Sequence, residues 1–134
     1  MKISLGLLVL RIGIGFVFCF FGFDKFPHSA DWVIYIPAGL FGAIAKISGL
    51  TIQTILRIQG LAELVIGIHL LLGFKTRITA GVGVVFLVLI ISVLEWGHVA
   101  VRDVGLLGAS LAIVFLGSGE FSLDAWLGKR GHKQ

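Results

Sequence analysis

The sequence predicts an all-α membrane protein built as a four-transmembrane-helix bundle, and three observations support this prediction. Of the 134 residues, 57% are hydrophobic and only 13% are charged, whereas about 25% are charged in a soluble domain. The mean hydropathy is +1.06. Four apolar stretches approach the roughly 20 residues that a helix needs to cross the hydrocarbon core. Because these stretches fill most of the chain, we expect a single membrane domain over residues 1–134.

The expected spans cover approximately residues 3–23, 53–73, 78–96 and 99–118. The first begins after Lys2, as a secretory signal peptide would. However, it continues through Gly22, contains Arg11 and is not followed by a small-residue cleavage site. We therefore interpret it as a retained first span.

The segment between the first two spans, residues 24–52, is predicted to be interfacial or re-entrant. Its apolar run is too short to span a bilayer and is interrupted by Pro37. Trp32 and Tyr35 suit the headgroup level. After the last span, Ser122 is a candidate N-cap and Asp124 would lie in the first turn, so we expect a short terminal helix.

The distribution of basic residues predicts the topology. With four spans, one side of the membrane carries six of them, namely Lys2, Lys75, Arg77, Lys129, Arg130 and Lys133, and the other carries Lys25, Lys46 and Arg102. The positive-inside rule then predicts a multi-pass protein of a bacterial-type cytoplasmic (inner) membrane with both termini in the cytoplasm. Because the basic residues are scattered or end apolar runs, the formal charge of +4 indicates contact with the lipid bilayer and no nucleic-acid partner.

Two ionisable residues lie inside expected spans. Glu63 is near the middle of the second span, where a carboxylate costs roughly 2.5–3.5 kcal/mol on insertion scales. A rise of about 1.5 Å per residue places Arg11 of the first span at a similar depth. We therefore predict an Arg11–Glu63 pair and favour a functional role for it. A pair that only fixes the register of the helices is the structural alternative.

Charged residues share helix faces with small residues, which let membrane helices approach closely. The predicted faces are Arg11, Gly15, Phe18, Gly22 and Lys25; Gln53, Arg57, Gly60, Glu63 and Gly67; and Arg102, Gly105, Ala109 and Ala112. Together they predict a mixed-charge pocket that opens toward the outer face above the Arg11–Glu63 pair. Its candidate residues are Glu63 and His98 for proton handling, and Arg11, Lys25, Arg57, Glu95, Arg102 and Asp103 for substrate binding. For Arg57 and Arg102, snorkelling to the headgroups is an equal alternative.

Several classes of site are not expected in this chain. The single cysteine, Cys19, excludes an internal disulfide, a CxxC pair and a zinc site built on cysteines. The sequence has no HExxH, no His/carboxylate set at metal-ligand spacing and no glycine-rich phosphate loop. We therefore expect no metal or flavin site of its own.

Six short motifs follow one another along the chain. They read LRIGIGF (10–16), FGFDKF (21–26), GLAELVIG (60–67), LGFKTR (72–77), RDVGLLG (102–108) and GSGEFSLD (117–124). In this order and spacing they resemble the DoxX/DoxD family of small four-helix membrane proteins. The resemblance covers nearly the whole length.

The resemblance implies a link to thiosulfate:quinone oxidoreduction or to membrane redox and thiol-stress complexes. Some relatives assist the maturation of partners that contain disulfides, but with Cys19 alone any thiol chemistry needs a partner subunit. The first hypothesis is therefore a quinone-associated redox subunit, whose site residues would take up the two protons of quinone reduction. The second is a non-catalytic structural or assembly subunit of a larger complex, and the third is a small transporter. Whether the chain is an enzyme stays open; if it is, we expect an oxidoreductase subunit that acts with a partner or as a homo-oligomer.

Overall fold

The computed structural model describes residues 2–93 and 97–131, and within these ranges it contains only helices and their connections. The elements are α1 (Lys2–Asp24), the 3₁₀ helix η1 (Asp31–Tyr35), α2 (Ala38–Ser48), α3 (Ile52–Leu72), α4 (Thr76–Val93), α5 (His98–Leu116) and α6 (Leu123–Gly131). Each of the four predicted spans corresponds to one long helix. The predicted all-α class is thus confirmed.

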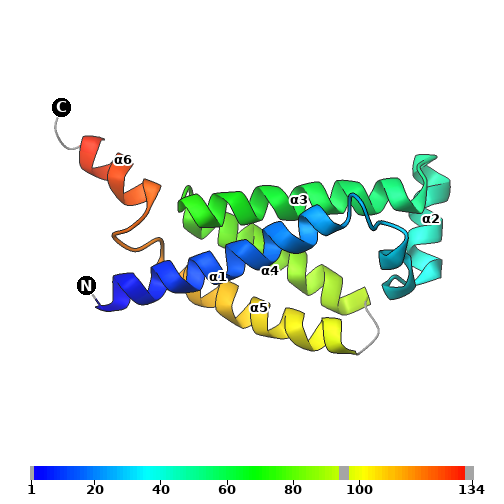
Figure 1. The fold of residues 1–134 in the computed structure, drawn as a ribbon, viewed down its shortest axis with the longest axis horizontal. Helices are drawn as coiled ribbons and strands as arrows, with labels where there is room; N and C mark the ends of the chain where they lie inside the picture. The colour runs from blue at the N-terminus through cyan, green and yellow to red at the C-terminus, as the bar shows by residue number, and fades with distance from the viewer. Residues whose placement is uncertain (1, 94–96, 132–134) are drawn as a thin grey trace.

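The four long helices run side by side, and the shorter elements lie at their two ends (Figure 1). At the loop end, η1 and α2 follow α1, and α2 crosses the bundle instead of running along it. At the termini end, α6 lies near the start of α1. Three helices, α1, α3 and α5, are long and apolar enough to cross a membrane, whereas the apolar part of α4 that is described ends at Ser92. The predicted third span extends to residue 96, and residues 94–96 lie outside the described residues.

The helix α2 forms where the sequence predicted a segment that does not span the membrane. Pro37 is its N-cap residue and Gly49, with φ of 70°, is its C-cap residue. Proline is tolerated at a helix start because the first N–H groups have no partner within the helix. Pro37 therefore marks where this helix begins.

The helices α1 and α3 pack closely because glycine lies on both sides of their contact. A methyl group on Gly60 would lie 2.6 Å from the carbonyl oxygen of Gly22, and one on Gly67 would lie 2.7 Å from that of Gly15. No Cβ atom fits at such distances. All five residues of the face predicted for the first span are buried, but of the second only Gly60, Glu63 and Gly67 are.

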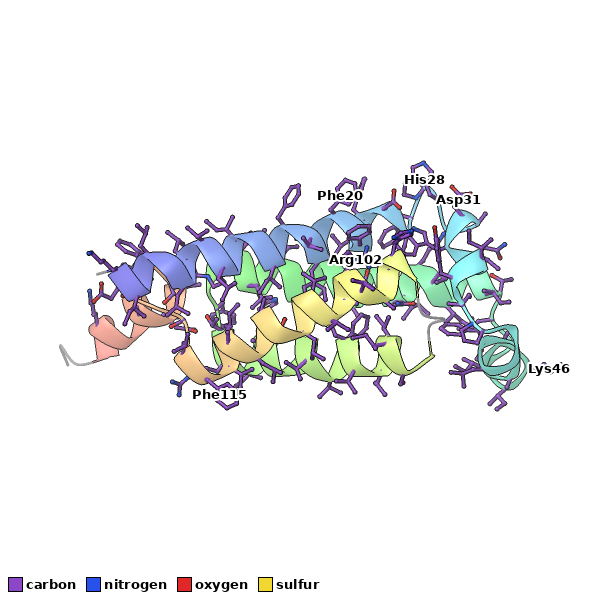
Figure 2. The ribbon with its side chains drawn as sticks, turned by 90° about the horizontal axis from the view of Figure 1, so that it is seen from below. Phe20, His28, Asp31, Lys46, Arg102 and Phe115 are labelled. Carbon is purple, nitrogen blue, oxygen red and sulfur yellow. The ribbon has the colours of Figure 1, made fainter. Side chains whose placement is uncertain are left out.

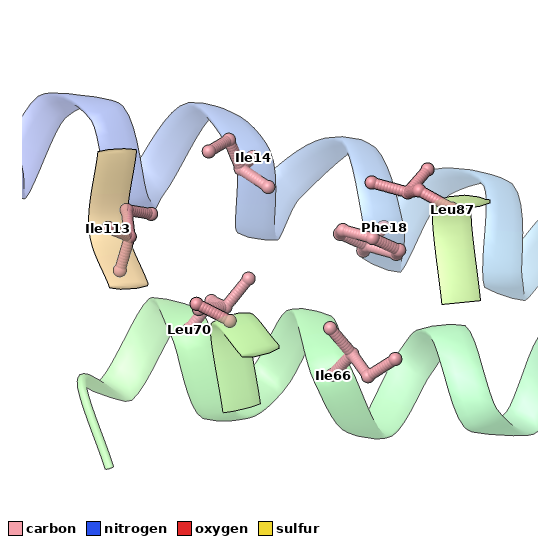
Figure 3. Packing of buried hydrophobic residues seen from close by; sticks show 7 residues of the cluster. Ile14, Phe18, Ile66, Leu70, Leu87 and Ile113 are labelled. Carbon is pink, nitrogen blue, oxygen red and sulfur yellow. The ribbon is translucent and has the colours of Figure 1, made fainter. Parts of the chain in front are cut away.

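The apolar core fills the middle of the bundle between these contacts. It comprises Ile14, Phe18, Ile66, Leu70, Ala80, Leu87 and Ile113 (Figure 3). The outside of the bundle is also apolar: Phe20 and Phe115, which point outward in Figure 2, are 55% and 75% exposed. Soluble monomers rarely expose contiguous apolar surface on this scale, whereas a helix in lipid does.

Arg11 lies at the termini end, and the predicted Arg11–Glu63 pair is wrong. Its Nη1 and Nη2 donate hydrogen bonds to the backbone carbonyls of Ser118 and Phe121, each at 2.6 Å. The prediction failed because it centred each span on the bilayer, whereas α1 starts well beyond the end of α3. A methyl group on Gly73, which has φ of 68°, would lie 2.7 Å from Arg11 Cζ. Glycine at this turn thus makes room for the guanidinium.

The segment after α5 closes the termini end through Asp124. The carboxylate of Asp124 accepts hydrogen bonds from the backbone N–H groups of Lys75 at 2.6 Å and Thr76 at 2.8 Å, where α4 begins. The Ser122 hydroxyl accepts one from the N–H of Ala125, so the predicted N-cap of the terminal helix is confirmed. We call the contacts of Arg11 and Asp124 with these backbone groups the termini clasp.

We predict that Gly60→Ala destabilises the bundle, because the new methyl group collides with the Gly22 carbonyl. Overpacking of this kind costs roughly 1–3 kcal/mol. The measurement is thermal unfolding in detergent. The matched control is Gly108→Ala on α5, where a methyl group would meet nothing within 4 Å and should be neutral or slightly stabilising. Equal midpoints for the two variants would contradict the close α1–α3 contact.

We also predict that Asp124→Asn loosens the termini clasp, because it removes the charge that caps the start of α4. Loss of a helix cap costs about 1 kcal/mol. Limited proteolysis should then cleave between α5 and α6 faster than in the unmodified protein. Glu120→Gln, at an exposed position of the same segment, is the control and should leave the cleavage rate unchanged.

Candidate functional site

Glu63 pairs with Lys25. Lys25 Nζ donates a hydrogen bond to Glu63 Oε2 at 2.5 Å, and the side chains are only 3% and 7% exposed. The pair follows from the α1–α3 contact, because Gly60 packs against Gly22 one turn before Lys25. Lys25 then reaches back along α3 to the carboxylate. Lys25, and not the predicted Arg11, is therefore the partner of Glu63.

A second ion pair comes from the start of α5. Arg102 donates from Nε at 2.8 Å and from Nη2 at 2.7 Å to Oδ1 of Asp103, whose side chain is 4% exposed. The Arg102 guanidinium also lies 3.9 Å from the ring centre of Phe21. The helix face predicted for this span was wrong by about one residue: the buried positions of α5 are Ala100, Asp103, Ser110 and Ile113.

Trp32 of η1 joins the first ion pair to the loop end. Its ring centre lies 4.1 Å from Lys25 Nζ, and its indole N–H donates to Asp24 Oδ2 at 2.9 Å. Asp24 Oδ1 lies 2.8 Å from Nδ1 of His28. From the sequence, Trp32 is predicted to be a headgroup anchor, and its contacts with Lys25 and Asp24 are not predicted. The one signal in the sequence is that Trp32 follows Lys25 by seven residues. That spacing does not predict a contact, because the path of the loop determines whether the two side chains meet.

The two ion pairs line one small cavity of about 40 Å³. Its wall includes Lys25, Glu63, Arg102 and Asp103, with Trp32, Tyr35 and Gln59 beside them. To hold one buried water, a cavity needs a volume of roughly 10–15 Å³ and two to four polar partners for the water. The cavity therefore accommodates a few water molecules next to the carboxylates. A further cavity of about 20 Å³ also touches Glu63, Arg102 and Asp103.

The four charged residues of this cluster balance one another, with two cations and two anions. Lys25, Glu63 and Asp103 are buried, so each would be strongly destabilising without its partner. The hydrogen bonds within the described residues engage one oxygen of each carboxylate. The arrangement can hold ordered water, donate hydrogen bonds to an oxygen and exchange a proton at a carboxylate. We call Lys25, Glu63, Arg102 and Asp103 the charged cluster.

The structure thus brings together four of the eight predicted site residues. Arg11 lies in the termini clasp at the other end of the bundle. Arg57 is exposed on α3, and His98 is exposed at the first position of α5; neither lines the cavity. Glu95 lies outside the described residues. The proposed roles of these residues in proton handling or substrate binding stay predictions.

Metal ligands do not gather in the part of the chain that the structure describes. Among residues 2–93 and 97–131, no group of three or more His, Cys, Asp or Glu side chains could hold a metal ion. At the loop end, Asp24 Oδ1 and His28 Nδ1 lie 2.8 Å apart, and Glu63 and Asp103 border one cavity.

Comparison with known proteins gives one match. The model of the DoxX family matches residues 6–96, which is more than half of the chain. No curated protein and no solved structure matches.

We predict that Lys25→Met destabilises the protein by about 3–5 kcal/mol, because it leaves Glu63 charged and buried without a partner. The double variant Lys25→Met/Glu63→Leu should recover most of this loss, since an apolar pair of similar size is often neutral. Denaturation in mixed micelles measures both variants. The control is Lys46→Met at an exposed position of α2, which should behave as the unmodified protein. A single variant as stable as this control would show that the pair is not buried.

Proposed function

The chain belongs to the DoxX family of membrane proteins, and we propose that it is a quinone-associated redox subunit. The observation that carries this proposal is the charged cluster beside a water-sized cavity inside an apolar bundle. An ionisable group inside a membrane is a functional-site hypothesis by default. Four ionisable side chains around one cavity strengthen this hypothesis.

The residues around the cavity fit a quinone by their chemistry. A bound quinone would supply two-electron, two-proton redox chemistry. The cavity, at about 40 Å³, is far below the roughly 300 Å³ of ordinary ligand pockets, so it suits water and not the ring. We therefore place the ring at the cavity rim, where the Gln59 amide and the Tyr35 hydroxyl offer hydrogen bonds and Phe41 offers an apolar wall.

In this proposal Glu63 stores and releases the proton. Its carboxylate borders the cavity, so water there can carry a proton between Glu63 and the rim. Lys25 stabilises the charged form of Glu63 by direct contact. When Glu63 is protonated, Lys25 keeps its contact with the Trp32 ring and a hydrogen bond to the Phe21 carbonyl at 3.4 Å. Lys25 therefore stays partnered in both states of Glu63.

The membrane arrangement that we propose has four spans, with α4 as the third, and both termini in the cytoplasm of a bacterial-type cell. The six basic residues on the side of the termini support this orientation. The charged cluster then lies toward the outer face of the inner membrane. Because Cys19 is the only cysteine, thiol or thiosulfate oxidation would need a partner subunit or a second copy. The chain would act within such a complex.

A structural or assembly subunit is the second candidate. It is favoured by the pairing of the buried charges, which link α1 to α3 and give Arg102 a partner within its own helix. Buried ion pairs can serve only to fix one arrangement of helices. This candidate predicts a stable protein with no affinity for a quinone.

We predict that Gln59→Leu and Glu63→Gln affect quinone chemistry differently. Gln59→Leu should weaken binding of a benzoquinone with a ten-carbon tail about tenfold, since a lost hydrogen bond of about 1.4 kcal/mol is one decade. Glu63→Gln should retain binding and lose proton-coupled turnover in the native membrane complex. Quenching of tryptophan fluorescence in nanodiscs measures binding. The matched control is Gln53→Leu, at an exposed position of the same helix.

Two results would overturn this proposal. If folded Gln59→Leu binds the quinone as tightly as Gln53→Leu does, the rim is not the binding site. If the unmodified protein binds no quinone but still co-purifies with a partner subunit, the assembly role replaces the redox role.

A further inference from the structure

An apolar groove lies beside the charged cluster, on the surface between α2, α3 and α4. Leu40 and Ile44 of α2 form one wall, and Phe86 and Leu89 of α4 form the other. Its volume is about 220 Å³, compared with about 40 Å³ for the polar cavity. Gln59 is its one polar residue. The groove is therefore suited to a hydrocarbon chain.

The groove and the polar cavity meet. Phe41, Gln59 and Ile90 line both of them, one residue from each of α2, α3 and α4. A ligand held at this junction would have hydrogen-bonding and charged groups on one side and an open hydrocarbon surface on the other. An amphiphile with a compact polar ring and a long apolar tail matches this change of polarity. The groove walls are accessible from outside, since Leu40 is 46% exposed and Leu89 is 62% exposed.

We propose that the groove binds the tail of an isoprenoid quinone, which reaches the site sideways from the bilayer between α2 and α4. The inference rests on the proposed function and adds the ligand class and its path. The ring then lies at Gln59 beside the cavity, and the tail lies along Ile44 and Leu89. The crosswise position of α2 at the loop end gives the groove the wall that the four long helices alone would lack (Figure 1).

The groove contributes only modestly to the binding free energy of the quinone. Lipid tails are as apolar as leucine, so moving a quinone tail from lipid into the groove gains packing and little hydrophobic free energy. The groove instead fixes the direction in which the ring approaches Gln59. We therefore expect a long-tailed quinone to bind about tenfold more tightly than a tail-less one, compared at equal concentration in the membrane.

The experiment is photo-crosslinking in nanodiscs with a benzoquinone that carries a diazirine at the end of a ten-carbon tail. The label should attach to peptides of α2 and α4 that contain residues 40–44 and 86–90. Ile44→Trp, which fills the groove, should reduce this labelling and the affinity of the long-tailed quinone about tenfold. It should leave binding of the tail-less quinone unchanged. Ile47→Trp is the control on the same helix, because Ile47 is 89% exposed and does not line the groove.

The outcomes separate this inference from the function on which it rests. Labels spread over the outer faces of α1 and α5 in the unmodified protein would overturn it, whatever the variants do. A phosphatidylglycerol with the same diazirine tail that labels the groove and is not displaced by quinone would make the groove a lipid site. In both cases Gln59-dependent binding of the tail-less quinone would leave the proposed function standing. If neither the long-tailed nor the tail-less quinone binds, the proposed function is wrong, and this inference is wrong with it.

Discussion

Lys25, directly after the end of α1, and Glu63, in the middle of α3, come within 2.5 Å because Gly22 of α1 packs against Gly60 of α3. With a methyl group at Gly22 or Gly60 the two helices would have to move apart, and Lys25 would move away from Glu63. Glu63 would then be a buried carboxylate without a partner, which would strongly destabilise the protein. The close approach of α1 and α3 is therefore what makes a buried charge tolerable here, and the cavity lies beside the resulting Lys25–Glu63 pair.

The charged side chains at the two ends of the bundle have different kinds of partner. At the termini end, Arg11 and Asp124 interact with backbone groups, so they satisfy helix ends and chain turns that would otherwise lack partners. At the loop end, charged side chains pair with one another around a water-sized space. The motifs that resemble the DoxX family thus divide into two groups. LRIGIGF, LGFKTR and GSGEFSLD build the clasp, whereas FGFDKF, GLAELVIG and RDVGLLG supply the charged cluster.

Hydropathy and capping rules predicted the helices well, because apolar length and local hydrogen bonding are properties of a segment alone. Ser122 and the four long helices are examples. The partner of Glu63 was not predictable in the same way. It depends on how far α1 slides along α3, and two helices of unequal length have no common centre from which depth can be counted. The buried face of α5 also differs from the expected one, because one residue of rotation moves Asp103 and Ser110 inward in place of Arg102 and Ala109. Trp32 reaches Lys25 only through the path of a loop.

Packing alone does not explain why this bundle keeps four charges. Glycine and core residues such as Ile14 and Leu70 already join its helices, and replacing a buried ion pair by apolar side chains is often neutral or stabilising. The four charges of the cluster border one cavity, next to a place where an apolar groove reaches a polar wall at Gln59. A purely structural pair has no need of a water-sized space or of lateral access. Proton exchange with a ligand drawn from the membrane needs both, and this is the physical reason to place the proposed function at the loop end.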